Sequence, residues 1–202
     1  MTSTVTSEIE VANLALGLVK EPGIGSFDDP TPASRWFKKH YIPSRHAVLA
    51  RHRWNFAQTR AALVADSVAP LFDWSYAYTL PSDCMRMYPP TVDGRRASAL
   101  LDHEVEGGKV LCNKSGPLYL RYVQDVENEA LLDPLFVEAF VFYLASNVAH
   151  VLSGKRSLID QYRRAFEGAL SDARSVDAMQ GTPDPVVTSD YISTRQQEWP
   201  YS

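Results

Sequence analysis

The chain has 202 residues, of which 45% are hydrophobic and 22% charged, and its formal net charge at pH 7 is −4. This composition is typical of a globular protein with one sizeable core, and a mildly acidic chain has no global basic field that would recruit nucleic acid. The only cysteines, Cys84 and Cys112, are far apart and cannot supply the roughly four ligands of a structural zinc site.

The first 52 residues predict two helices. Ser7 and Glu10 have the spacing of a capping box, so we expect a helix over about residues 7–20. Thr31-Pro32 predicts the start of a second helix over residues 32–52, because proline fits the first helical position. Pro43 lies inside this segment and predicts a kink or a break near Tyr41.

Residues 54–124 have an extended pattern instead of a helical one. Trp74, Tyr76 and Tyr78 alternate with small or polar residues, which predicts a strand. Gly107-Gly108 separates two short extended runs and predicts a two-residue hairpin turn. A further strand is expected over residues 119–123. We therefore expect a small antiparallel sheet inserted between helices.

The rest of the chain predicts two more helices and a tail. Asp133-Pro134 is a typical helix start, and the helix expected over residues 134–153 is apolar nearly all round. It contains Glu138, so we interpret it as a core helix and not as a membrane span. A fourth helix, capped by Ser157, is expected over residues 157–178, with apolar residues along one face.

The whole pattern predicts an α+β protein that is mainly α. One domain over residues 1–180 is a helical bundle with an inserted small antiparallel sheet, and residues 181–202 form an extended C-terminal arm. Prolines block a helix in this arm, yet its aromatic residues are unlike those of a solvated tail. The arm either covers its own bundle or reaches a neighbouring subunit or another partner.

Motifs of catalysis and cofactor binding do not occur. Gly23-Ile24-Gly25 lacks a third glycine and a preceding strand, and the chain has no Walker A, HExxH or GxSxG motif. The sequence therefore predicts no enzyme, no metal site and no cofactor. Four arginines form a basic stretch with Trp54 and Phe56: Arg45, Arg51, Arg53 and Arg60. One interpretation is that they stack on bases or grip phosphates. We favour the other, in which they pair with carboxylates, preferably on a neighbouring subunit.

Several short motifs nevertheless occur in a characteristic order. They are Ala15-Leu16-Gly17, Ile24 with Asp28-Asp29, Ala47-Val48-Leu49, Arg53-Trp54-Asn55-Phe56-Ala57, Leu80-Pro81-Ser82-Asp83-Cys84, Arg121-Tyr122-Val123 and Asp133-Pro134-Leu135-Phe136. In order and spacing they resemble the tail adaptor proteins, or tail tubular protein A family, of short-tailed double-stranded DNA phages. The resemblance extends from the first helix to the fourth, and the C-terminal arm is its least similar part.

The resemblance implies a structural role in the virion. A protein of this family forms a ring, expected to be dodecameric, between the portal protein and the tail nozzle protein, with an axial channel through which genome DNA passes. It is made in the host cytoplasm, works at the head–tail junction and contacts no membrane. The family has no catalytic residues. Alternatives are a connector or head-completion protein of a longer-tailed phage, and a small-molecule-binding module or enzyme.

The interface residues of such a ring are predicted from residue type. Aromatic residues and arginine dominate protein interfaces, and this chain has many aromatic residues for one small core. The predicted interface residues are Trp36, Tyr41, Arg53, Trp54, Trp74, Tyr76, Tyr78, Tyr191, Trp199 and Tyr201.

Overall fold

The computed structural model describes residues 5–95, 101–152, 154 and 156–180. Within this part of the chain the fold is α+β and mainly α, which confirms the predicted class. The elements are α1 (Glu8–Val19), α2 (Pro32–Leu49), η1 (Asn55–Ala57), β1 (Gln58–Leu63), β2 (Tyr76–Thr79), β3 (Cys84–Met87), β4 (His103–Glu106), β5 (Lys109–Cys112), β6 (Leu118–Gln124), η2 (Glu129–Leu131), α3 (Pro134–Leu152) and α4 (Arg156–Met179).

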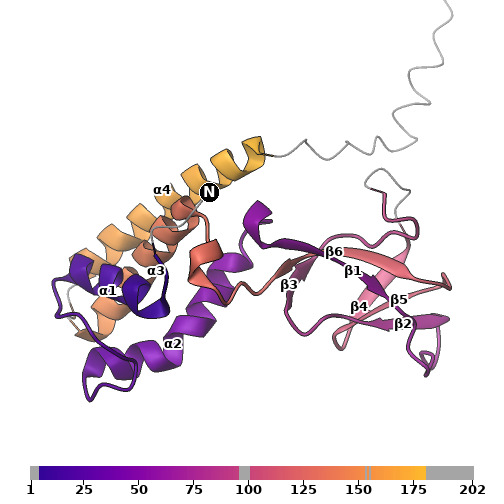
Figure 1. Ribbon diagram of the computed structural model, residues 1–202, viewed down its shortest axis with the longest axis horizontal. Coiled ribbons are helices and arrows are strands. Elements are labelled where there is room, and N and C mark those ends of the chain that lie inside the picture. The colour runs from indigo at the N-terminus through magenta and orange to yellow at the C-terminus, as the bar shows by residue number, and fades with distance from the viewer. Residues whose placement is uncertain (1–4, 96–100, 153, 155, 181–202) are drawn as a thin grey trace, which may run out of the picture.

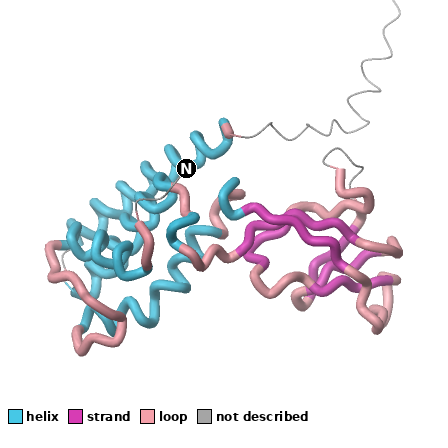
Figure 2. The backbone as a smooth tube through the Cα atoms, in the orientation of Figure 1, coloured by secondary structure: helices cyan, strands magenta, loops and turns pink. Residues whose placement is uncertain are grey.

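The elements form two lobes that lie side by side, a helical lobe of α1 to α4 and a β lobe of the six strands (Figure 1). Figure 2 shows the same division, with the helices on one side and the strands on the other. The chain passes from α2 through η1 into β1, and it returns from β6 through η2 into α3. The strands are thus an insertion between the second and third helices, as predicted.

Helix α3 is the centre of the helical lobe. It contacts α1, α2 and α4, and its buried side chains include Phe136, Phe140 and Leu144. By length and composition alone α3 could cross a membrane, but 56% of its apolar window is buried inside the protein. A helix that is apolar nearly all round needs several neighbours, and these three helices supply them.

The helix starts follow the capping signals. Ser7 Oγ accepts a hydrogen bond from the backbone N–H of Glu10, and Thr31 Oγ1 accepts one from that of Ser34. Asp133 Oδ1 accepts from the backbone N–H of Leu135 in the same way. The fourth start was placed wrongly: α4 begins at Arg156, so Ser157 lies within its first turn and not at the cap.

Helix α2 is shorter than predicted and is not broken at Pro43. It ends at Leu49 and not at residue 52, because the backbone N–H of Arg51 bonds to the carbonyl of Val48 and tightens the last turn. The helix is continuous through Pro43, so the expected break near Tyr41 is absent. Buried residues on both sides of the proline hold the two halves of α2 against the core.

The β lobe has two antiparallel sheets where one was predicted. Their strand orders are β1-β6-β3 and β2-β5-β4, and a second hydrophobic core lies between them. Its fully buried side chains include Tyr78, Val110 and Leu120. A pair of sheets buries the inner face of both, which a single exposed sheet cannot do. The β4–β5 hairpin has Gly107 and Gly108 at its turn, each with positive φ, as predicted.

Candidate functional site

Two of the predicted interface residues belong to the core of the helical lobe. Tyr41 and Trp54 are each 1% exposed. The Trp54 ring makes an edge contact with Phe136 at 5.1 Å between centroids, and the Tyr41 ring makes one with Phe140 at 5.4 Å. These side chains have no free surface for another subunit. Their assignment to an interface is therefore corrected: their aromatic area packs α2 and η1 against α3.

Tyr78 is a third correction. Its side chain is fully buried in the core of the β lobe, and its hydroxyl donates to the carbonyls of Lys114 and Gly116 at 2.7 and 2.9 Å. Burial raises the pKa of Tyr78 above its ordinary value. The hydroxyl thus stays protonated and ties β2 to the β5–β6 loop, which is a structural role.

The remaining predicted interface residues in the described chain keep some exposed surface. Trp36, Trp74 and Tyr76 are half-buried, and Arg53 is exposed beside the Tyr88 ring. Trp36 helps to line an open hollow of about 500 Å³ between α2 and α3, together with residues such as Tyr143. Tyr191, Trp199 and Tyr201 lie outside the described residues.

Two arginines of the basic stretch, Arg45 and Arg51, form ion pairs with carboxylates of the same chain. Arg51 pairs with Glu167 of α4 at 3.3 Å and lies over the Phe166 ring at 4.9 Å. Arg45 is 2% exposed and cannot reach another subunit, which corrects the preferred interpretation for this residue. Carboxylate pairing itself was predicted correctly for Arg45 and Arg51, but the partners belong to the same chain.

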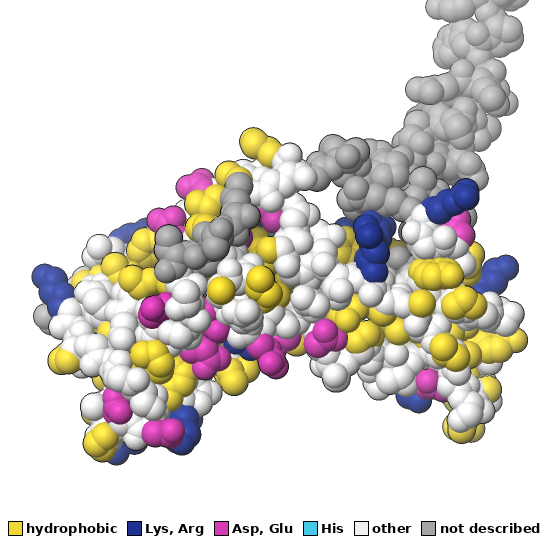
Figure 3. All heavy atoms as spheres, in the orientation of Figure 1, with side chains coloured by type: hydrophobic (Ala, Val, Ile, Leu, Met, Phe, Trp, Pro, Cys, Tyr) yellow, Lys and Arg dark blue, Asp and Glu magenta, His cyan; other side chains and the backbone are white. Residues whose placement is uncertain are grey.

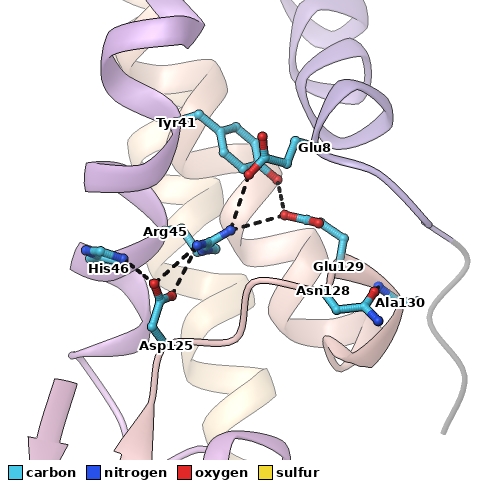
Figure 4. Close-up of polar contacts among 8 residues, drawn as sticks. All are labelled: Glu8, Tyr41, Arg45, His46, Asp125, Asn128, Glu129 and Ala130. Carbon is cyan, nitrogen blue, oxygen red and sulfur yellow. Dashed lines mark hydrogen bonds and ion pairs between the residues drawn. The ribbon is translucent and has the colours of Figure 1, made fainter. Parts of the chain in front are cut away.

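Arg45 is the centre of a buried polar cluster (Figure 4). Its guanidinium lies 3.3 Å from Glu129, 3.2 Å from Asp125 and 3.4 Å from Glu8. Glu8 comes from α1, whereas Asp125 and Glu129 come from the short stretch between the end of β6 and η2, so one cation joins two parts of the chain that are far apart in sequence. Because Arg45 itself lies on α2, the cluster braces the helical lobe at the point where the chain returns from the β lobe.

Two further groups complete this cluster. The Tyr41 hydroxyl donates to Glu129 at 3.3 Å, and His46 Nε2 lies 2.7 Å from Asp125 (Figure 4). Burial and the neighbouring carboxylates of Glu129 and Glu8 raise the pKa of Tyr41 far above its ordinary value. Burial likewise raises the pKa of Glu8, assisted by Glu129. The tyrosine is therefore a permanent hydrogen-bond donor in this network.

The described chain does not assemble a metal site from its histidines, cysteines and carboxylates. His46 and His52 each face one carboxylate, Asp125 and Asp177. Burial raises the pKa of the Cys84 thiol, which disfavours the thiolate that nucleophilic chemistry needs. The two histidines thus make side-chain contacts between distant segments of the same chain.

Among the described residues, the most exposed large apolar side chain is Leu71, in the loop between β1 and β2. Leu71 is 96% exposed and Phe72 75%, and Val68 is exposed to the same extent as Phe72. We call Val68, Leu71 and Phe72 the apolar tip. The end of the loop next to β2 is anchored to β4, because the Trp74 indole N–H donates a hydrogen bond to the Glu104 carboxylate of β4 at 3.1 Å. Figure 3 shows hydrophobic side chains gathered over this lobe.

Sequence reasoning missed the apolar tip. Residues 66–73 contain Pro70, Asp66 and Asp73 among small residues, a composition that indicates a link between elements. The one available signal was the apolar pair Leu71-Phe72, which belongs to no helical or strand pattern of apolar residues and so is not predicted to lie in a core. Exposed apolar groups of this kind mark contact surfaces for proteins.

Comparison with known proteins found no match to this chain among protein-family models or among curated proteins.

Proposed function

We propose that this protein is a head-to-tail adaptor of a short-tailed double-stranded DNA phage. Copies of the chain join into a ring, expected to be dodecameric, between the portal protein and the tail nozzle protein. DNA passes through the axial channel without sequence-specific contacts, and the protein works in the virion after synthesis in the host cytoplasm. The order of the motifs from Ala15 to Phe136 supports this proposal, and a helical bundle with a β insertion agrees with it.

The apolar tip is the observation that carries the proposal. A ring needs a heterologous contact, in which one surface of a subunit binds a different surface of the next. The tip lies on the β lobe, and the hollow beside Trp36 lies on the helical lobe between α2 and α3. We infer that the tip of one copy enters the Trp36 hollow of its neighbour. Leu71 and Phe72 then lose their exposed surface on assembly.

Leu71→Asp tests this contact. A charge at the tip should weaken assembly of the ring on the portal protein by about tenfold or more, because a buried apolar anchor is replaced by a desolvated carboxylate. The melting temperature should stay within about 2 °C of wild type, since the Leu71 side chain is already in water. Sedimentation of portal mixed with increasing amounts of the variant measures the effect.

Leu131→Asp is the matched control. Leu131 is 60% exposed and lies in η2, away from the β1–β2 loop. This variant should assemble like wild type. Equal loss of assembly in both variants, or wild-type assembly of Leu71→Asp, would contradict a specific contact at the tip.

A further inference from the structure

A groove with two arginines lies on the outer face of the sheet β1-β6-β3. Arg60 of β1 stands directly opposite Arg121 of β6 in the antiparallel register. Together with Asn55, Gln58 and Thr59 they line an open, mainly polar hollow of about 520 Å³. We call these five residues the arginine groove. It is separate from the apolar tip and from the buried cluster around Arg45.

The positive charge of this groove is not neutralised by the described chain. Within the described residues no carboxylate lies within ion-pair distance of Arg60 or Arg121, and Arg121 instead lies over the Tyr88 ring at 5.5 Å. Like charges directly opposite each other on paired strands destabilise a sheet. The groove therefore suits an anionic ligand.

Helix α4 ends beside the arginine groove. The backbone N–H of Asn55 donates to the Asp177 carboxylate at 2.9 Å, and Asn55 Nδ2 donates to the Asp177 carbonyl at 2.6 Å. Asn55 is itself one of the groove residues, and α4 ends two residues after Asp177, at Met179. The segment 181–202 thus starts within a few residues of the groove, and even a small part of its length is enough to reach Arg60 and Arg121.

The composition of residues 181–202 matches this groove. The segment contains three acidic residues, Asp184, Asp190 and Glu198, against one basic residue, Arg195. Its aromatic side chains, such as Trp199, are of the kind that stacks on arginine guanidinium planes. Arginine pairs with carboxylates through two parallel hydrogen bonds, so an acidic peptide is the ligand that this surface recognises best.

We propose that the arginine groove is a binding site for an acidic, aromatic peptide segment, and that its occupant is the segment 181–202 of the same chain. The segment leaves α4 at the edge of the groove and lies across β1 and β6, with its carboxylates on Arg60 and Arg121. This site goes beyond the proposed adaptor function and does not depend on it. The acidic segment removes the repulsion between the two arginines and is held against the β lobe.

A photo-cross-linker in the full-length chain tests the proposal. Ala62 is exposed on β1, two residues from Arg60 and on the same face, so Ala62→p-benzoylphenylalanine places the probe at the groove. Irradiation followed by peptide mapping should join residue 62 to residues within 181–202, with a yield that does not change on dilution. The same probe in place of Ala69, an exposed residue of the β1–β2 loop, should give no such product.

Charge variants show whether the arginines hold the segment. Arg60→Gln with Arg121→Gln should lower the yield of the cross-link by about tenfold, because both charge-assisted partners are lost. This double variant should fold, since it removes a like-charge pair. Arg35→Gln with Lys39→Gln, which removes the same charge from exposed positions on α2, should leave the yield unchanged.

Three results would overturn the proposal. The first is the absence of a product between residue 62 and the segment. The second is a product whose yield does not respond to the Arg60 and Arg121 substitutions. The third is a product with a different occupant. A product that joins two chains and disappears on dilution would show that the occupant is a second copy, and one that forms only with an added oligonucleotide would show that it is a nucleic acid.

Discussion

Arg45→Ala should lower the free energy of unfolding by about 3–5 kcal/mol, because removal of the buried cation leaves the Glu129 and Asp125 carboxylates buried without the guanidinium that neutralises them. Glu129 is the most affected of them: it is 5% exposed, and it retains only the Tyr41 hydroxyl as a hydrogen-bond donor among the described side chains. Asp125 keeps His46 as its partner. Urea unfolding followed by circular dichroism measures the loss.

Two further variants make this test specific. Lys38→Ala breaks the ion pair with Asp28, in which both side chains are largely exposed, and should change stability by less than about 0.5 kcal/mol. In a double-mutant cycle, Arg45→Ala combined with Glu129→Ala should lose less than the sum of the single variants by about 1–3 kcal/mol. Additive losses, or an Arg45→Ala variant as stable as wild type, would show that the cluster does not brace the fold.

Trp54→Ala should be similarly destabilising, by about 3–5 kcal/mol, because a large side chain is removed from a closely packed core. The Trp54 ring lies between His52, Phe56 and Phe136, and its indole N–H donates to the Val48 carbonyl at 3.4 Å. This residue stands where the chain passes from α2 into β1. Its loss therefore loosens the contact between the helical lobe and the start of the β lobe, which chemical denaturation detects.

Trp36→Ala is the control for Trp54. Trp36 is half-buried and packs on Phe37 and His40 at the surface of α2. Part of its ring is already in water, so the same truncation should cost only about 1–2 kcal/mol. Equal losses in the free energy of unfolding for Trp36→Ala and Trp54→Ala would contradict the greater contribution to stability that the burial of Trp54 indicates.

The features that local sequence predicts are those whose cause is local. Ser7, Thr31 and Asp133 each bond to a backbone N–H two or three residues further on, so their pattern is visible within one turn of the chain. Gly107-Gly108 is the same kind of signal, because positive φ at two successive residues favours glycine. These elements start or turn where predicted.

The features that depend on long-range pairing were not predictable in this way. Glu129 meets Arg45 across 84 positions, and Gln58 of β1 pairs with Val123 of β6. No spacing rule relates such residues, so neither the buried cluster nor the division into two sheets followed from the pattern. The assignment of Tyr41, Trp54 and Tyr78 to an interface was wrong for a related reason: two separate cores use more rings than the single core that was assumed.

The candidate surfaces were only partly predictable. A periodic pattern identifies core faces, but it does not show which apolar residues of a loop stay in water, as Leu71 and Phe72 do. Arg60 belonged to the predicted basic stretch, yet its opposite residue, Arg121, comes from β6 and joins it only through the register of the strands. Neither the apolar tip nor the arginine groove could be identified without the three-dimensional structure.

The adaptor role is tested most directly by mixing the wild-type protein with the portal protein encoded in the same genome. The mixture should sediment as one complex, and electron microscopy should show a closed ring of this chain on one end of the portal, with an open axial channel. The ring should not form when the portal is replaced by an unrelated ring protein of similar size. A chain that stays monomeric in the presence of the portal and never sediments with it would contradict the account.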